Sequence, residues 1–129
     1  MEITALVSML LLSVSHNSVA WTPVRQYMSI QQAEMRWGKS PFDVKNFKTG
    51  NESIRASMVA SLIASKALIG KPFKSIREEL GNPDGYFENK AIPAYLLSTK
   101  EKDIWQVIIL PDDRWEKVSD VRIHKNCCE

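Results

Sequence analysis

Cysteine is scarce in this sequence. Its 129 residues include two Cys, which stand side by side at Cys127 and Cys128. A disulfide between neighbours closes only a small strained ring, whereas a stabilising disulfide closes a long loop. A metal site would need further Cys or His at ligand spacing, and His124 is the one candidate nearby. We therefore expect no metal site, and we interpret residues 126–129 as an exposed tail whose thiols can pair with each other or with another molecule.

A long hydrophobic run is also missing. The main apolar stretch, Ile3–Val14, has 12 residues, and a membrane-spanning helix needs about 20. Small residues follow at Ser18 and Ala20, as at a signal-peptidase site, although Met1-Glu2 lacks the usual positive charge. We interpret residues 1–20 as a signal peptide cleaved after Ala20, and a buried N-terminal helix is the alternative. The expected location is periplasmic or secreted, without a lipid anchor, because Trp21 stands where a lipidated Cys would.

The sequence has no marked excess of one charge and no enzyme signature. Its net charge is +2, and the densest basic cluster, Lys71, Lys74 and Arg77, is interrupted by Pro and Phe. A nucleic-acid footprint would be a basic stripe or face, so we expect no nucleic-acid partner. GxSxG, P-loop and GxGxxG motifs are absent. His124 is expected at the surface or at a sheet edge, and the pairs Glu78-Glu79 and Asp112-Asp113 are too close in sequence to flank a bond. We expect no catalysis, cofactor or small-molecule substrate.

What the sequence does contain is one strong helix signal. The stretch NESIRASMVASLIASKALIG predicts a helix over residues 53–68, capped by Asn51 or Ser53 and ended by Gly70. Arg55 falls within its apolar arc, so it either extends along the surface to water, which we favour, or pairs with a carboxylate. The opposite side carries no charge, and it either packs under the preceding residues or binds a partner. Its small residues are Ala56, Ser57, Ala60, Ser61, Ala64 and Ala67.

A second, short helix is predicted over residues 72–80. Phe73, Ile76 and Leu80 form its narrow apolar stripe, Gly81 supplies the residue after the helix, and Pro83 prevents its continuation. Residues 82–85, Asn-Pro-Asp-Gly, suit a type I turn. A helix of two turns is marginal alone, so it must pack on the rest of the chain.

Three strands are predicted next, over residues 92–98, 104–110 and 115–124. Pro93 places the first at a sheet edge, because proline cannot donate to a strand ladder. The second is apolar on both faces, which fits the centre of an antiparallel meander. We therefore predict an α+β fold with two helices on one face of a three-stranded antiparallel sheet (ααβββ) over residues 51–125. Residues 21–50, with possible anchors at Trp37, Phe42 and Phe47, are interpreted as an N-terminal extension.

The segment Arg55–Asp84, RASMVASLIASKALIGKPFKSIREELGNPD, resembles the SmpA/OmlA (BamE-like) family of small envelope proteins. The likeness lies in an R–M–L helix followed by L-x-G-K and LG-x-P-D at this spacing. The resemblance implies the ααβββ fold over about Phe42–Ile123, and a non-catalytic binding or scaffold role like that of the small component of the outer-membrane β-barrel assembly machinery. The motif residues are Arg55, Gly70, Leu80, Gly81, Pro83 and Asp84.

Two functions are compatible with these observations. The first is an envelope scaffold whose partner is another envelope protein or the outer-membrane surface, and the second is a secreted enzyme inhibitor of the β-lactamase-inhibitor type. An inhibitor should present exposed aromatic residues on the sheet or its hairpins, whereas a scaffold should present a flat apolar or Ala-rich patch. One uncovered apolar surface is expected to bind the partner, on the sheet or on the first helix. Its candidate residues are Ile108, Leu110, Ala56, Ala60 and Ala64.

Overall fold

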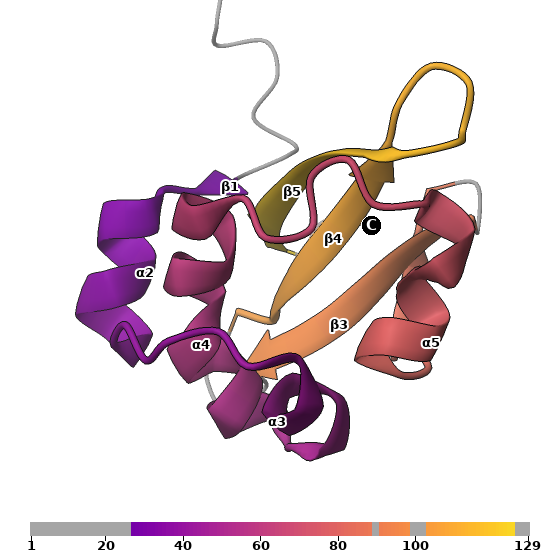
Figure 1. Ribbon diagram of the computed structural model, residues 1–129. Helices are drawn as coiled ribbons and strands as arrows, with labels where there is room; N and C mark the ends of the chain where they lie inside the picture. Colours follow the sequence, from indigo (N-terminus) through magenta and orange to yellow (C-terminus); the bar gives the residue numbers. More distant parts are fainter. Residues whose placement is uncertain (1–26, 89–90, 99–102, 126–129) are drawn as a thin grey trace, which may run out of the picture.

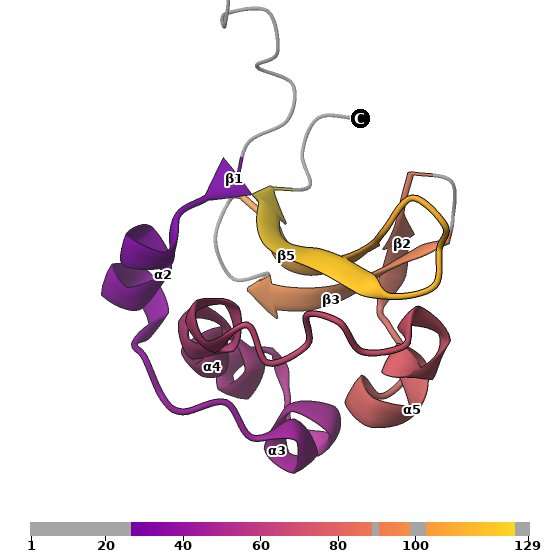
Figure 2. The ribbon, with the colours of Figure 1, turned by 45° about the horizontal axis from the view of Figure 1, so that its top comes forward.

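The computed structural model describes residues 27–88, 91–98 and 103–125. The expected signal peptide and the Cys pair lie outside these residues. The fold is α+β, with helices on one face of a five-stranded antiparallel sheet of order β1-β5-β4-β3-β2 (Figures 1 and 2). In the described part of the chain, no helix is long and apolar enough to cross a membrane. The elements are β1 (Tyr27–Met28), α2 (Ile30–Trp37), α3 (Val44–Thr49), α4 (Glu52–Ser65), the 3₁₀ turn η2 (Phe73–Ser75), α5 (Ile76–Leu80), β2 (Gly85–Phe87), β3 (Ile92–Ser98), β4 (Trp105–Pro111) and β5 (Val118–Lys125).

The predicted meander is present, and it is extended at both edges. Strands β3, β4 and β5 match the three predicted strands, and β4 lies at the centre of the sheet as expected. The three-stranded prediction is wrong, because β1 pairs with the outer side of β5 and β2 with the outer side of β3. Strands of two and three residues are too short to show a two-residue periodicity, so the sequence pattern could not reveal them.

Pro93 does not mark a sheet edge. It pairs with Tyr86 of β2, so β3 is an interior strand. The ladder between β3 and β4 begins one residue later, at Ala94 opposite Ile108. Pro93 therefore lies beyond the β4 ladder, where its missing N–H removes no β3–β4 hydrogen bond.

The first predicted helix is real but shorter than expected. Asn51 caps α4 by accepting a hydrogen bond from Ile54 N at 3.0 Å. The helix ends where Lys66 adopts a left-handed conformation with φ 56°. Gly70, the predicted end, lies in the following turn with φ 87°.

The second predicted helix has the predicted stripe. It consists of η2 followed by α5, and both Ile76 and Leu80 are buried in the core. Gly81 follows with φ 93°, and its carbonyl accepts a hydrogen bond from the Tyr95 hydroxyl at 2.7 Å. Asn82 and Asp84 lie in bends, Gly85 begins β2, and Asp84 N donates across to Ala94 O of β3. The LGNPD sequence thus connects the end of α5 to the sheet.

Residues 27–50 are part of the same core. A capping box between Ser29 and Gln32 begins α2, and Asp43 caps α3. Phe47 is fully buried between the rings of Phe42 and Tyr95, with centroid distances of 6.0 and 5.6 Å. The expected aromatic anchoring is therefore confirmed, but the described part of the expected extension supplies two helices and a strand to the domain.

Candidate functional site

The residues predicted to bind a partner do not form a surface. Ala56 and Ala60 are buried, because α2 packs against α4. The segment after α2 adds a hydrogen bond from Ser40 N to Ser57 O at 2.9 Å. Ala64 alone of the three alanines is exposed. The Ala-rich side of α4 is therefore an internal packing face, which was the other possibility that the sequence left open.

The sheet face opposite the helices is also closed. Ile108 is 0% exposed and packs with Ile92 and Ala94, while Phe87 and Leu110 are partly buried against them. The prediction of a docking patch on this face is wrong, because neighbouring side chains cover Ile108 of β4. Curvature of the sheet brings side chains of distant strands together over it.

His124 belongs to this closed face. It is buried on β5, and its ring lies 5.8 Å from the Tyr27 ring and 4.7 Å from the Phe87 ring, measured between centroids. The expectation of a surface or edge histidine is therefore wrong. These contacts identify His124 as a packing residue between β1 and β2.

Arg55 and Asp84, the two charged residues of the family-like motif, form an ion pair. The distance from Arg55 Nη2 to Asp84 Oδ2 is 3.4 Å, and the guanidinium carbon lies 5.8 Å from the centroid of the Phe47 ring. The same Oδ2 accepts a hydrogen bond from Leu96 N at 2.8 Å. The alternative that Arg55 pairs with a carboxylate is therefore correct. The favoured alternative, in which Arg55 extends along the surface to water, is wrong. The pair connects α4 to the β2–β3 end of the sheet, so its role is structural.

Exposed aromatic residues gather instead where α5 meets the β4–β5 hairpin. Trp115, in the hairpin, is 46% exposed and packs edge-on against Phe73 of η2, with 5.7 Å between the centroids. Tyr86 of β2 is 42% exposed. Trp and Tyr are the residue types most enriched among those that dominate protein–protein binding energy.

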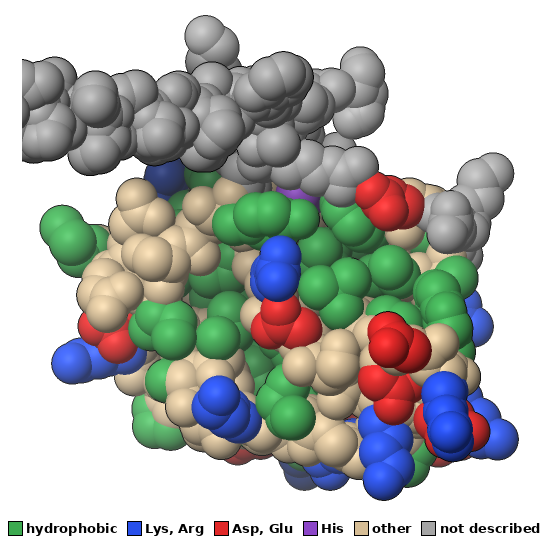
Figure 3. All heavy atoms as spheres, turned by 90° about the horizontal axis from the view of Figure 1, so that it is seen from above, with side chains coloured by type: hydrophobic (Ala, Val, Ile, Leu, Met, Phe, Trp, Pro, Cys, Tyr) green, Lys and Arg blue, Asp and Glu red, His purple; other side chains and the backbone are tan. Residues whose placement is uncertain are grey.

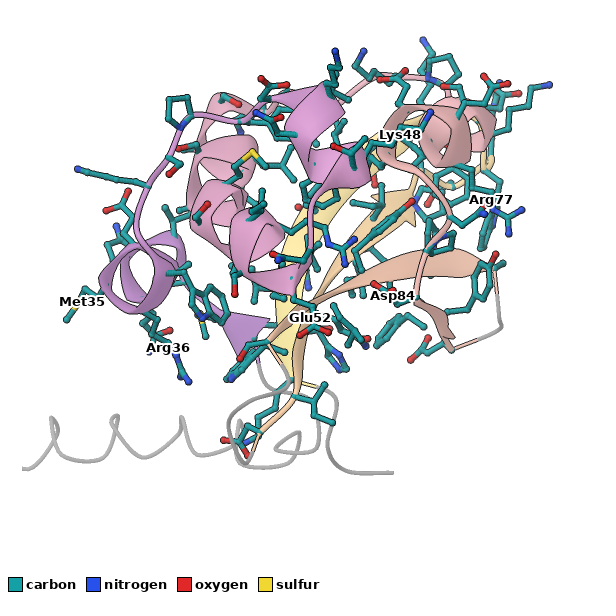
Figure 4. The ribbon with its side chains drawn as sticks, turned by 90° about the horizontal axis from the view of Figure 1, so that it is seen from below. Met35, Arg36, Lys48, Glu52, Arg77 and Asp84 are labelled. Carbon is teal, nitrogen blue, oxygen red and sulfur yellow. The ribbon has the colours of Figure 1, made fainter. Side chains whose placement is uncertain are left out.

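A hollow of about 360 Å³ lies between Phe73 and Tyr86. Arg77 of α5 lies at the hydroxyl end of the Tyr86 ring, with its Cζ 5.6 Å from the ring centroid, and donates a hydrogen bond to the Tyr86 hydroxyl. In Figure 4, Arg77 lies at the opposite end of the molecule from Met35 and Arg36 of α2. The lining consists of Phe73, Lys74, Ile76, Arg77, Tyr86, Ala91 and Pro93. We refer to this hollow together with Trp115 as the aromatic site.

The hairpin that carries Trp115 is fixed by Asp112. The Asp112 carboxylate accepts a hydrogen bond from Glu116 N at 2.9 Å, which is the main reason that its pKa lies below the ordinary value. Trp115 N donates to Asp112 O at 3.0 Å, and Trp115 has φ 58°. A left-handed conformation is unfavourable for a bulky residue and is found mostly where the surrounding structure imposes it. The indole is therefore held outward by the turn.

The segment between α4 and η2 ties this hairpin to α5. Gly70 N donates to Val118 O, and Val118 N donates to Lys71 O, each at 2.9 Å. Phe73 N donates to Glu116 O at 2.8 Å. These backbone bonds fix Phe73 and Trp115 relative to each other, so the aromatic site is preformed.

A smaller hollow of about 140 Å³ lies between the end of α4 and β5. Figure 3, which looks onto the top of Figure 1, shows that hydrophobic side chains gather on this side of the molecule among charged ones. This hollow has both a cation and a carboxylate in its lining, so it has no charge preference. Its residues are Leu62, Ile63, Lys66, Ile69, Ser119, Asp120 and Val121.

The described residues contain no group of three or more His, Cys, Asp or Glu side chains that could hold a metal ion. No family model, curated protein or solved structure matches this chain. The resemblance to the SmpA/OmlA family therefore remains an interpretation of the Arg55–Asp84 motif. The sequence did not predict the aromatic site, because the third predicted strand, over residues 115–124, starts at Trp115, whereas β5 begins at Val118. The available signal was a Trp that stands among charged neighbours, Asp112, Asp113, Arg114 and Glu116.

Proposed function

We propose that this chain is a non-catalytic, protein-binding domain that acts in the bacterial envelope. The SmpA/OmlA-like motif and the signal-peptide-like residues 1–20 support the compartment. The aromatic site supports binding, because it presents Trp, Tyr and Arg side chains at one end of a rigid domain. The partner is another envelope protein that docks on this end.

The observation that carries the proposal is the contact between Phe73 and Trp115. Exposure of an apolar indole to water is unfavourable, and a half-exposed indole contributes little to the core. The position of Trp115 on a fixed hairpin therefore favours a role in recognition. The neighbouring Tyr86 and Arg77 widen the contact area, since both lie at the surface around the same hollow. A partner that covers Trp115 would therefore also reach the hollow.

A second candidate function is inhibition of an enzyme, of the β-lactamase-inhibitor type. The exposed aromatic residue on the hairpin favours it, because a protruding hairpin can enter an active-site cleft. The buried state of Ala56 and Ala60 argues against a scaffold that docks through an Ala-rich patch. Assays of β-lactam hydrolysis with and without the protein distinguish the two candidates. Inhibition that is lost in Trp115→Ala would favour the inhibitor.

Binding is tested by capture from an envelope extract on the immobilised protein. We compare the unmodified chain, a Trp115→Ala/Tyr86→Ala double variant and a Met35→Ala control, since Met35 is 86% exposed on α2. A specific partner should be retained by the unmodified chain and the control, and lost from the double variant. Equal capture by all three proteins would contradict the proposal.

The compartment is tested by mass spectrometry of the protein expressed with its own leader. The expected product lies outside the cytoplasm, begins at Trp21 and carries no lipid. A chain with intact Met1 in the cytoplasmic fraction would contradict the envelope location, and it would leave the binding result unaffected.

A further inference from the structure

The hollow of the aromatic site has a lining of one charge sign. Lys74 and Arg77 lie among apolar and aromatic side chains, and no Asp or Glu of the described residues contributes to the lining. This differs from the smaller hollow beside β5, whose lining includes both Lys66 and Asp120. A ligand that enters the larger hollow therefore meets positive charge at the rim and apolar surface within it.

The cations of this hollow also differ from other basic residues close by. Lys71 pairs with Glu79 at 3.3 Å, and Arg55 pairs with Asp84 at 3.4 Å. No carboxylate among the described residues pairs with Lys74 or Arg77. Their charges are thus available to a ligand.

The hydrogen bond to the Tyr86 hydroxyl holds the Arg77 guanidinium at the rim of the hollow. A guanidinium has five N–H donors, and the hydrogen bond to the Tyr86 hydroxyl uses one of them. The remaining donors can bind a carboxylate through two parallel hydrogen bonds, a geometry that favours arginine over lysine. Because the Tyr86 hydroxyl already orients the guanidinium, less side-chain entropy is lost when a carboxylate binds.

The apolar part of the hollow suits one large side chain. Phe73 and Tyr86 provide its accessible surface above the buried Ile76 and Pro93, and Trp115 extends it beyond Phe73. A volume of about 360 Å³ lies at the low end of the roughly 300–1,000 Å³ of small-molecule sites. That space fits a single aromatic or aliphatic side chain with its flanking backbone better than it fits the chains of a lipid.

We infer that the hollow receives an acidic peptide segment of the partner protein, in which a carboxylate neighbours a large apolar side chain. The carboxylate binds Arg77 and Lys74, and the apolar side chain packs between Phe73 and Tyr86. This inference rests on the proposed function and specifies the chemistry of the segment that the aromatic site recognises. It does not depend on whether the partner is an enzyme.

The probe is a fluorescently labelled pentapeptide, Ser-Glu-Phe-Glu-Ser, with blocked ends, and the measurement is fluorescence polarisation at low salt. We expect saturable binding that weakens about tenfold or more in Arg77→Ala and in Lys74→Ala. Replacing both glutamates of the peptide by glutamine should weaken binding equally, as should replacing its phenylalanine by serine. Lys45→Ala, an exposed cation on α3, is the matched control and should bind the peptide as the unmodified chain does.

Three outcomes would overturn the inference. They are equal binding of the glutamate and glutamine peptides, undiminished binding by Arg77→Ala, and no peptide binding together with Arg77-dependent binding of phosphatidylglycerol vesicles. Melting temperatures of the variants show whether each is folded. If envelope capture depends on Trp115 but the peptide does not bind, the proposed function stands and this inference fails. If the peptide binds but no envelope protein is captured, the proposed function fails instead.

Discussion

The rings of Phe87 and His124 lie 4.7 Å apart between centroids, at an interplanar angle of 73°. They belong to β2 and β5, which have β4 and β3 between them in the sheet. In a flat sheet these strands would lie about 14 Å apart, because neighbouring strands are separated by about 4.8 Å. The contact therefore shows that the sheet is strongly curled and that side chains of its own strands fill its concave face.

Ile108→Lys should destabilise the domain strongly. Ile108 is fully buried on that concave face, so the substitution places an ammonium group among apolar side chains. The expected loss is about 3 kcal/mol or more of unfolding free energy, measured by urea denaturation. Val44→Lys, on a 40% exposed position of α3, is the control and should stay within about 0.5 kcal/mol of the unmodified chain. Comparable midpoints for the two variants would mean that the concave face is open.

The Arg55–Asp84 pair should show energetic coupling between α4 and the sheet. A double-mutant cycle with Arg55→Met and Asp84→Asn should give an interaction energy of about 1 kcal/mol, because the pair is partly shielded from water. Asp84→Ala should cost more than Asp84→Asn, since it also leaves Leu96 N without its acceptor. If the effects of the two single substitutions add up to that of the double substitution, the interaction energy is zero and the ion pair makes no measurable contribution to stability.

Alkaline stability should depend on Tyr95. Burial raises the pKa of its phenol to about 12 from an ordinary value of 10.0. A group whose pKa is higher in the folded state contributes its full stability below the unfolded pKa, and that contribution is lost as the pH rises through the folded pKa. Unfolding free energy should therefore fall between about pH 10 and pH 12 because of this residue.

The comparison for this prediction is Tyr95→Phe. At neutral pH it should be less stable by about 1 kcal/mol, because Gly81 O loses its hydrogen-bond donor. Between pH 10 and 12 its stability should fall less steeply than that of the unmodified chain. Parallel pH profiles for the two proteins would show that another group governs alkaline unfolding.

Two substitutions of Trp115 should differ in their effect on stability and agree in their effect on binding. Trp115 has a φ of 58°, which is unfavourable for alanine and costs glycine nothing, so Trp115→Gly should be about 1 kcal/mol more stable than Trp115→Ala. Both variants lose the indole and should lose partner capture to the same extent. Thermal denaturation and the capture assay provide the two measurements. Capture retained in either variant would remove Trp115 from the binding surface.

The sequence predicted those elements whose signals are strong within a short window. The apolar character of β4 on both faces placed it at the sheet centre, and the Ile76–Leu80 stripe with its following glycine located α5. Helix α2 was ambiguous because it has 8 residues, too few to stand out within the longer segment, and Ala33 is its one fully buried residue. Its capping box, Ser29 with Gln32, was nevertheless readable.

The candidate site was harder to predict than the fold. Periodicity identifies residues that face a core, and Trp115, Tyr86 and Arg77 all face away from it. Their proximity arises from backbone pairing between the segment after α4 and the start of β5, which no local pattern encodes. The sequence located apolar surfaces correctly on β4 and α4. It could not show that Phe87 and α2 would cover them.

The pairing of the segment after α4 with β5 also sets an order of assembly during synthesis. Phe73 contacts a residue 42 positions later in the chain, Trp115, so the aromatic site cannot form until β5 has been made. At roughly 5–20 residues per second, translation separates the two residues by roughly 2–8 s. A chain that contains α4 and α5 but not β5 is therefore unable to bind a partner through this site. Binding competence arises only after β5 has joined the sheet.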